Sequence, residues 1–212
     1  RQAFSLASEA CLSPPEVIRQ ISERISNLQN ASNKDTDLLK LLETDLCPIY
    51  DKILTYTREN NNSKIIWRKQ KIAATSQVLC PSDLGFNNIL RQTDGKLVFV
   101  DFEYFGWDDP VKMIADFLLH PAHRLKQSQK KIFFNESRNI FSNILLFSDR
   151  FNSLLPFFEI RWCLIILNPF CNDYRLDRRI ELTPQLKRQR LSEVQKRLTN
   201  LLNWYKTTDY GK

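Results

Sequence analysis

PSDLGFNNIL (residues 81–90) and VDFEYFGWDDP (residues 100–110) stand on either side of a short stretch of the sequence. Between them, the pair Asp94–Gly95 separates two runs of β-prone residues, which is the strongest hairpin signal in the chain. A hairpin brings the residues before its first strand beside those after its second strand. The pattern therefore predicts that four polar side chains meet at one end of an apolar hairpin: Asp83, Asn88, Asp101 and Glu103.

These side chains are of the types that phosphoryl transfer needs. Magnesium prefers oxygen ligands, usually one or two carboxylates or an amide, and phosphate oxygens complete its octahedron. Asn88 and Asp101 supply that pair of ligands. Asp83, set five residues before Asn88, remains free to accept a proton from an attacking hydroxyl group. The pattern predicts one base and two metal ligands, as in the phosphoryl-transfer template.

The same two stretches resemble the catalytic loop and metal loop of the aminoglycoside phosphotransferase and choline kinase-like superfamily. In this family the catalytic loop reads HxDxxxxN, and a hairpin then leads to a metal motif, Asp-x-Asp or Asp-x-Glu. The stretch DFEYFGWDDP is also similar to the Asp-Tyr-Glu-Tyr stretch of choline and ethanolamine kinases. The resemblance implies ATP and Mg²⁺ as cofactors and a small-molecule hydroxyl as the phosphoryl acceptor. It makes Asp83 the catalytic base, Asn88 and Asp101 the metal ligands, and Glu103 the second acidic position.

The sequence departs from the family pattern in the loop itself. Pro81 stands where the family has histidine, so the orienting role of that imidazole is absent or filled otherwise. Ser82 is expected to support the loop. The family has an acidic residue, one helical turn after the Asp-Pro pair, that ties down the catalytic loop. Asp116, six residues after Pro110, is the nearest candidate for that role.

A glycine-rich phosphate loop is missing as well. The first 84 residues contain no glycine, and three of the four glycines lie in the hairpin segment. Backbone N–H groups can approach phosphates closely only where glycines allow it. Members of the family begin with a β-rich lobe that carries this flap and an ATP-orienting lysine. We therefore expect this chain to be a C-terminal lobe without the nucleotide lobe.

The expected fold is mainly α-helical with one small buried hairpin, the catalytic lobe of a protein-kinase-like α+β fold. A single domain over 1–212 is expected, with a helical region (1–80), the catalytic loop, hairpin and metal loop (81–107), and a helical substrate-side region (108–212). Apolar spacing and helix-start residues predict these helices: 14–28, 37–56, 64–74, 110–120, 140–147, 154–167 and 183–204. Pro48 is expected to kink or break the second helix.

Several residues near the hairpin can be interpreted either as site residues or as structural ones. Asp83 could be a turn or capping residue, and Glu103 a surface charge. Asp108 and Asp109 are expected to cap a helix. Aromatic side chains could line an acceptor pocket that favours a cation, or could pack in the core; the candidates for the pocket are Tyr104, Trp107 and Trp162.

The net charge of +7 is concentrated between Arg175 and Arg197. This stretch could attract RNA or an anionic surface, but a solvated helix face is the simpler interpretation. Nucleic acid is not expected as a partner, because no aromatic residues or glycines interleave the charges. His120 and His123 are interpreted as a surface helix end rather than a metal site. Five scattered cysteines indicate reduced thiols in a cytoplasmic protein. No apolar run reaches the length of a membrane span.

Three functions remain open at this point. The first is ATP- and Mg²⁺-dependent phosphorylation of a small-molecule hydroxyl, at least in a longer protein that includes the nucleotide lobe. The second is a catalytically inactive kinase-like binding module, which Pro81 and the missing flap suggest. The third is an RNA or anionic-surface binder through residues 175–197. The sequence identifies neither the phosphoryl acceptor nor the oligomeric state.

Overall fold

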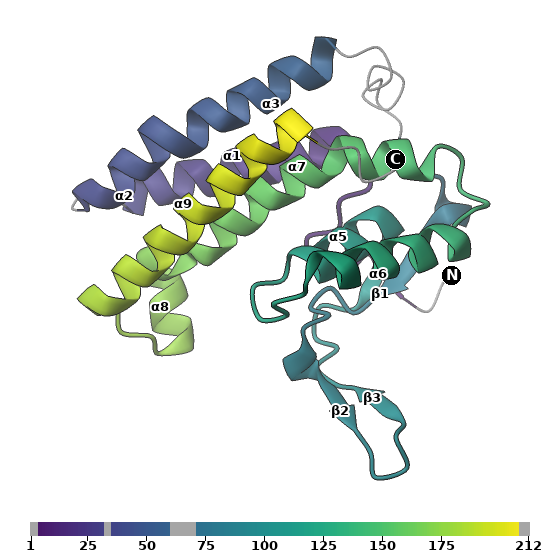
Figure 1. Ribbon diagram of the computed structural model, residues 1–212. Coiled ribbons are helices and arrows are strands. Elements are labelled where there is room, and N and C mark those ends of the chain that lie inside the picture. Colours follow the sequence, from purple (N-terminus) through teal and green to yellow (C-terminus); the bar gives the residue numbers. More distant parts are fainter. Residues whose placement is uncertain (1–3, 32–34, 60–70, 208–212) are drawn as a thin grey trace.

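The computed structural model describes residues 4–31, 35–59 and 71–207 of the 212. Within these ranges the protein is mainly helical, with two pairs of short antiparallel strands (Figure 1). The elements follow in this order: α1 (Pro14–Ala31), α2 (Thr36–Lys40), η1 (Leu41–Leu46), α3 (Cys47–Glu59), η2 (Ala74–Ser76), β1 (Val78–Cys80), η3 (Phe86–Asn88), β2 (Ile89–Arg91), β3 (Leu97–Phe99), β4 (Gly106–Asp108), α5 (Pro110–Leu119), α6 (Gln127–Ile140), α7 (Phe147–Ile166), η4 (Asn168–Phe170), α8 (Asn172–Arg178) and α9 (Pro184–Thr207).

The N-terminal helices form where the sequence predicts them. Proline in the first turn and an apolar stripe that includes the buried Val17 and Ile21 define α1. The second predicted helix is present as α2, η1 and α3 in succession. Pro48 does not break it. Because Pro48 has no N–H to donate one turn back, the chain adopts the wider π-helical turn η1 immediately before it.

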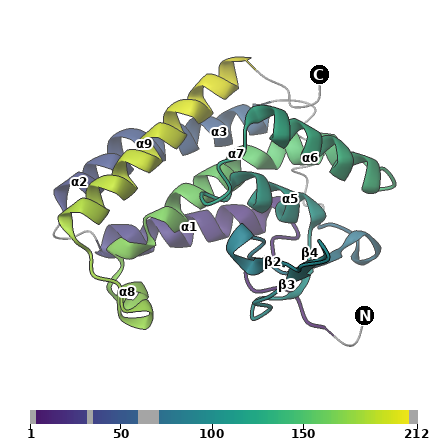
Figure 2. The ribbon, with the colours of Figure 1, turned by 60° about the horizontal axis from the view of Figure 1, so that its bottom comes forward.

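Helix α7 forms the centre of the core. It packs against α1, α3, α5 and α9, and Figure 2 shows α1, α7 and α9 running alongside one another. Phe151, Phe157 and Phe158 are completely buried on α7, and burying each such side chain contributes about 1.5–3 kcal/mol. The stretch Phe147–Phe170 has the length and composition of a membrane span, but 72% of its most apolar window is buried inside the fold. It is therefore a core helix.

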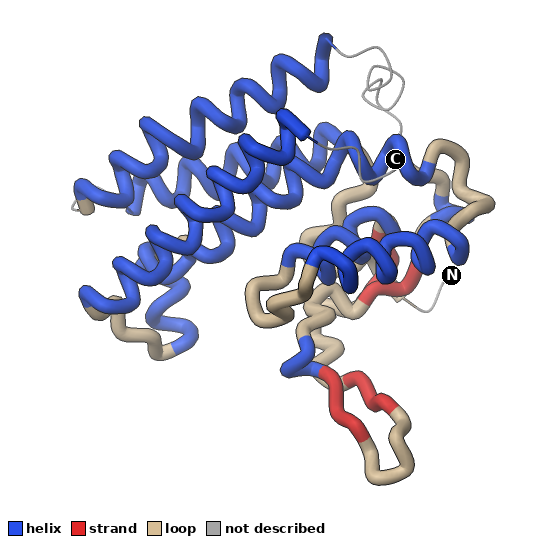
Figure 3. The backbone as a smooth tube through the Cα atoms, viewed as in Figure 1, coloured by secondary structure: helices blue, strands red, loops and turns tan. Residues whose placement is uncertain are grey.

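The hairpin forms as predicted, but it is not buried. Strands β2 and β3 pair antiparallel, with Leu90 opposite Val98, and Gly95 at the turn has a φ of 87° that favours glycine. Figure 3 shows the hairpin projecting from the helical body. Leu90 is 54% exposed and Leu97 58% exposed. The expectation of a buried hairpin is therefore wrong, because no other described element covers the apolar side chains of these strands.

A second strand pair was not predicted. Strand β1 pairs antiparallel with β4, with Leu79 opposite Trp107, so the region expected to be helical before the catalytic loop ends in a strand. Residues 5–7 lie against β4, since Ala7 N–H donates to the Trp107 carbonyl at 3.1 Å. A Cβ at Gly106 would lie 2.4 Å from the Ala7 nitrogen. Glycine at 106 is therefore required by this close approach.

The remaining predicted helices differ in outcome. The stretch 140–147 is wrong as a helix: α6 ends at Ile140, turns follow, and Leu146 has a left-handed φ of 57° just before α7 begins. The helix predicted over 64–74 lies largely outside the described residues. The helices predicted over 110–120, 154–167 and 183–204 are confirmed as α5, the C-terminal part of α7, and α9.

Candidate functional site

The catalytic-loop candidate is closed by a bond between its two end residues. The side-chain amide of Asn88 donates to the main-chain carbonyl of Asp83 at 3.1 Å. Asn88 is only 7% exposed, and its side chain also bonds the Asp83 carboxylate, which helps to lower the pKa of that group. The loop from 83 to 88 is thereby fixed in one shape at the base of β2.

Asp101 lies two residues after β3, the strand that pairs with β2. Val100 N–H donates to the Asn88 carbonyl at 3.0 Å, which extends the β2–β3 ladder by one bond. Asp101 is exposed and has a left-handed φ of 65°, a backbone conformation that residues other than glycine seldom adopt and that recurs at functional sites. The hairpin therefore brings Asp83, Asn88 and Asp101 to its base. Glu103, two residues further on, is exposed at the same end.

Ser82 ties the catalytic-loop candidate to the metal-loop candidate. Its hydroxyl donates to the Tyr104 carbonyl at 3.0 Å, across a separation of 22 residues. Its own N–H donates to the Cys80 sulfur at 3.3 Å, and its φ is left-handed at 65°. The same Tyr104 carbonyl also accepts the Ser8 N–H at 3.1 Å. The two loops and the N-terminal segment are thus joined at one carbonyl group.

His120 contacts Asp83 from the end of α5. Its Nε2 lies 3.5 Å from the Asp83 Oδ1. Its Nδ1 accepts the Ala122 N–H at 3.2 Å, so the ring proton of the neutral form is on Nε2 and is available to Asp83. This hydrogen bond is the largest cause of the lowered pKa of Asp83. The edge of the Trp162 ring packs against the imidazole, with 5.1 Å between ring centroids.

His123 holds the middle of the same loop. Its Nε2 accepts the Phe86 N–H at 3.1 Å, and its Nδ1 lies 2.6 Å from the Phe117 carbonyl. A backbone N–H can only donate, so Nε2 is unprotonated and Nδ1 carries the proton. Burial lowers the pKa of His123, which is 6% exposed. The two histidines do follow the end of α5, as predicted, but the expectation that they lie on the surface is wrong, because both contact the loop from 83 to 88. Two histidines after a helix that ends before Pro121 are the sequence feature that could have indicated this.

Asp116, the candidate for tying down the catalytic loop, lies instead in a buried ionic cluster on α5. Lys112 Nζ is 2.9 Å from Asp116 and 3.0 Å from Asp108. Burial opposes the charge on Lys112, yet the two carboxylates raise its pKa overall. Arg161 lies 3.4 Å from Asp116, and the Trp162 indole N–H donates to it at 2.9 Å. Among the described residues, a chain of contacts through Trp162 and His120 connects Asp116 to Asp83.

The two acidic residues before α5 have different roles. Asp109 is the N-cap, as predicted, because its carboxylate accepts the Val111 N–H at 2.8 Å, and it is also paired with Arg150 at 2.6 Å. Asp108 is not a cap. It accepts the Cys11 N–H at 2.9 Å and pairs with Lys112, so it attaches the N-terminal segment to α5.

The three aromatic candidates for an acceptor pocket lie in different surroundings. Trp162 lies beside His120 on α7. Trp107 is in β4, opposite Leu79 and bridged to Leu6. The Tyr104 phenol bonds the side chains of Glu103 and Arg178; Glu103 is the main cause of its raised pKa. Of the three side chains, that of Trp162 contacts His120, which in turn contacts Asp83, whereas Tyr104 is joined to the catalytic loop through its main-chain carbonyl.

A metal at the hairpin would rely on few protein ligands. In the described portion of the chain, no group of three or more His, Cys, Asp or Glu side chains is placed to hold a metal ion. Asn88 and Asp101 offer one amide and one carboxylate oxygen. That donor set fits magnesium, which retains waters and takes phosphate oxygens as further ligands.

Comparison with known proteins supports the fold. No protein-family model matches the sequence, and no curated protein matches it. Among solved structures, the chain is similar to an ethanolamine kinase from Plasmodium vivax, with a TM-score of 0.53 and 15% sequence identity. The match covers 88% of this chain and 48% of the kinase chain, so this chain spans about half of that protein's length. At this identity the similarity shows a kinase-like fold.

Proposed function

We propose that this chain is the catalytic lobe of a phosphotransferase that uses ATP and Mg²⁺ to phosphorylate a small-molecule hydroxyl, as in the aminoglycoside phosphotransferase and choline kinase-like superfamily. The bond from Asn88 to the Asp83 carbonyl carries the proposal, because it fixes the base candidate and the amide ligand candidate in one rigid loop. The kinase-like fold gives independent support.

In this proposal, each residue has one role. Asp83 is ionised at neutral pH, and the hydrogen bond from His120 lowers its pKa further. It positions the acceptor hydroxyl and takes its proton. Asn88 and Asp101 hold Mg²⁺, and Glu103 is the second acidic group. Mg²⁺, when bound, would neutralise part of the phosphate charge. The protein contributes mainly position and electrostatics, which suffice for phosphoryl transfer.

His120 and His123 take over the support that the family obtains from its loop histidine. Pro81 occupies that position here, and a proline ring can neither donate nor accept through its side chain. His120 instead bonds Asp83, and His123 accepts the Phe86 N–H in the middle of the loop. This arrangement weakens the case for an inactive binding module, which rested partly on Pro81.

A nucleotide lobe is proposed to cover the projecting hairpin. Four apolar side chains on and just after its strands are 43–58% exposed: Leu90, Leu97, Phe99 and Phe102. Leu97 and Phe99 share one face of the hairpin, whereas Leu90 and its partner Val98 lie on the other face. Exposed apolar side chains such as Leu97 and Phe99 are of the kind that a second lobe can cover. The base of the same hairpin carries the metal-ligand candidates, so a lobe that covers it could present nucleotide phosphates to Asn88 and Asp101.

The basic stretch 175–197 gives little support to an RNA binder. Arg197 pairs with Glu159 at 3.0 Å, Lys187 pairs with Asp35 at 2.5 Å, and Arg175 donates to the Pro169 carbonyl at 3.2 Å. Cations engaged within the fold are less available for phosphates. Of the two alternatives, we retain only the inactive kinase-like module.

The test uses the full-length protein with any nucleotide lobe included. We expect Mg²⁺-dependent stabilisation by ATP or ADP in a thermal-shift assay, and ATP-dependent phosphorylation of one or more members of a panel of amino alcohols and aminoglycosides. Asp83→Asn should abolish transfer but retain nucleotide binding, whereas Asp101→Ala should abolish the Mg²⁺-dependent shift. Asp51→Asn, on an exposed face of α3, is the control. An absent shift in the unaltered protein would favour the inactive module.

A further inference from the structure

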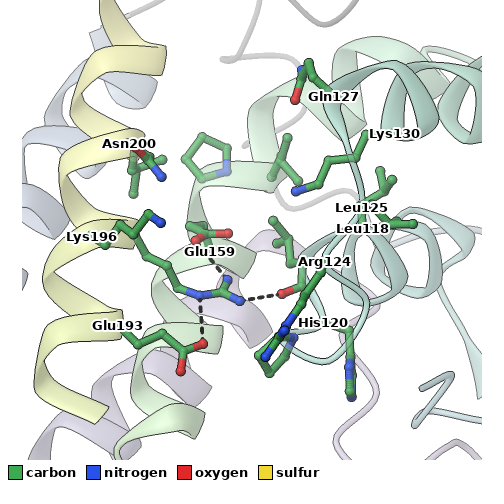
Figure 4. A pocket seen from close by; sticks show the side chains of 16 residues that line it. Leu118, His120, Arg124, Leu125, Gln127, Lys130, Glu159, Glu193, Lys196 and Asn200 are labelled. Atoms are coloured by element: carbon green, nitrogen blue, oxygen red, sulfur yellow. Dashed lines mark hydrogen bonds and ion pairs between the residues drawn. The ribbon is translucent and has the colours of Figure 1, made fainter. Parts of the chain in front are cut away.

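A cavity of about 490 Å³ is lined in part by His120, the histidine that contacts Asp83 (Figure 4). The end of α5, the beginning of α6, and the facing sides of α7 and α9 enclose it. Its volume is in the range of small-molecule sites. Part of its wall is apolar and comes from α5, the loop before α6, α7 and α9: Leu118, Leu125, Leu155, Pro156 and Leu201.

The acidic groups in this cavity are already engaged. Arg197 lies 3.0 Å from Glu159 and 3.7 Å from Glu193, and it donates to the Leu119 carbonyl at 2.9 Å. Figure 4 labels the two carboxylates, Glu159 on α7 and Glu193 on α9, and dashed lines mark these contacts. Burial raises the pKa of Glu159 in spite of Arg197. This cluster fixes α9 against α7 and α5 and forms a rigid floor for the cavity.

Three further cations line the cavity: Arg124, Lys130 and Lys196. Among the residues that the structure describes, none of the three has a carboxylate within 4.0 Å. Lys130 and Lys196 extend toward the space from opposite walls, α6 and α9 (Figure 4). Burial lowers the pKa of Lys130, and Arg197 adds to this while Glu159 opposes it. The cavity therefore carries more positive charge than its two carboxylates balance.

We propose that this cavity binds a small amphiphilic anion, with its carboxylate or phosphate group between Lys130 and Lys196 and its apolar body against the leucine-lined wall. An anion would supply a carboxylate or phosphate within ion-pair distance, which neither ammonium group has among the described residues. An aliphatic or aromatic body would fill a space whose wall is largely Leu and Pro. The proposal does not depend on the proposed phosphotransfer, because neither lysine belongs to the hairpin site.

The histidine content allows a direct test of the proposal. The chain has two histidines, so ¹⁵N-labelled imidazoles give two sets of NMR signals. His120 lines the cavity whereas His123 does not. The full chain is titrated with octanoate, octyl phosphate and inorganic phosphate, with octyltrimethylammonium as the cationic control. Saturable shifts of the His120 signals with octanoate or octyl phosphate, larger than those of His123, are the expected result.

Variants separate this site from nonspecific binding. Lys130→Met combined with Lys196→Met should weaken binding of the effective octyl anion by about tenfold or more, since charged hydrogen-bond donors are lost. Lys131→Met, which removes an exposed charge from the same helix, should leave affinity unchanged. If the double variant unfolds, Leu125→Trp replaces it and should block the cavity.

Comparison of the affinities for octanoate and octyl phosphate identifies the preferred anionic group. Weaker binding of inorganic phosphate than of octyl phosphate would show that the apolar chain of the ligand contributes to binding. The proposal is overturned if neither octyl anion gives a saturable response, if the cationic control binds equally well, or if the lysine double variant retains full affinity. Equal affinity for inorganic and octyl phosphate would overturn the amphiphilic character of the ligand.

Discussion

The side-chain amide of Asn88 donates to the main-chain carbonyl of Asp83 at 3.1 Å, which joins the two ends of a short loop. The Asn88 side-chain oxygen in turn accepts from the Asn87 amide at 2.8 Å. Both polar ends of a nearly buried side chain are thus engaged within the loop. A change at Asn88 should therefore affect stability as well as any metal binding.

Asn88→Ala should lower the free energy of unfolding by about 1–3 kcal/mol, because it leaves the Asp83 carbonyl without its partner in a partly buried loop. Urea unfolding followed by circular dichroism measures this. Asn139→Ala removes an exposed amide from α6 and should have little effect. Equal stability of the two variants would show that the loop does not depend on the Asn88 bond.

His120→Ala should raise the pKa of Asp83 toward its ordinary value of 3.8, since the hydrogen bond from His120 is the main cause of the lowering. NMR titration of the carboxyl carbon measures the change. The ionised carboxylate contributes stability above the ordinary pKa, and this contribution is lost as the pH falls through the lowered folded value. The variant should therefore lose less stability than the wild type across that acidic window. An unaltered Asp83 pKa would refute the role of His120.

His123 should make the protein less stable as the solution becomes mildly acidic. Its folded pKa lies below the ordinary 6.5, chiefly because of burial and with a further contribution from His120, while Phe117 and Asp83 oppose the shift. The unfolded chain therefore takes up the proton first, and stability falls as pH falls below the ordinary value. Protonation of Nε2 would also break its bond with the Phe86 N–H.

Urea unfolding at a series of pH values, from about pH 7.5 to about pH 5.5, tests this dependence. His123→Gln should flatten the curve in that range, because glutamine does not titrate. The pH dependence of stability that remains in the variant gives the contribution of all other titrating groups. If wild type and variant lose stability in parallel, His123 is not the titrating group.

Lys112→Met should destabilise the fold by about 3–5 kcal/mol, because it leaves the buried carboxylates of Asp108 and Asp116 without their shared ammonium group. Thermal and urea unfolding measure the loss. Arg19→Ala breaks an ion pair with the same four-residue spacing on the exposed face of α1 and should leave the melting temperature nearly unchanged. A small effect of Lys112→Met would mean that Asp108 and Asp116 protonate or find other partners.

Local signals in the sequence identified the hairpin and the start of α5. Asp94–Gly95 specifies a tight turn, and Asp109–Pro110 combines a capping carboxylate with a proline suited to the first helical turn. Both features depend on residues close together in the chain. The exposure of the hairpin could not be inferred in the same way, because apolar residues such as Leu90 and Leu97 usually indicate a buried strand.

The features that sequence reasoning missed depend on distant residues. Strands β1 and β4 have three residues each, too few to show an alternating pattern. His120 lies 37 positions beyond Asp83, and only the tertiary packing of α5 places the end of this helix beside the loop. Lys112 resembles a solvated helix residue in the sequence, yet it is 1% exposed. Roles in catalysis for Asp83, Asn88 and Asp101 stay predictions until the variants are measured.

The projecting hairpin also offers a practical handle on the molecule. The polar cluster lies at its base, whereas Thr93, Asp94 and Gly95 form an exposed tip that makes no contact with the helices among the described residues. A cysteine and fluorophore at Thr93 would therefore sit apart from the candidate site. Such a label could follow the arrival of a second lobe or a nucleotide in real time without altering the groups that bind it.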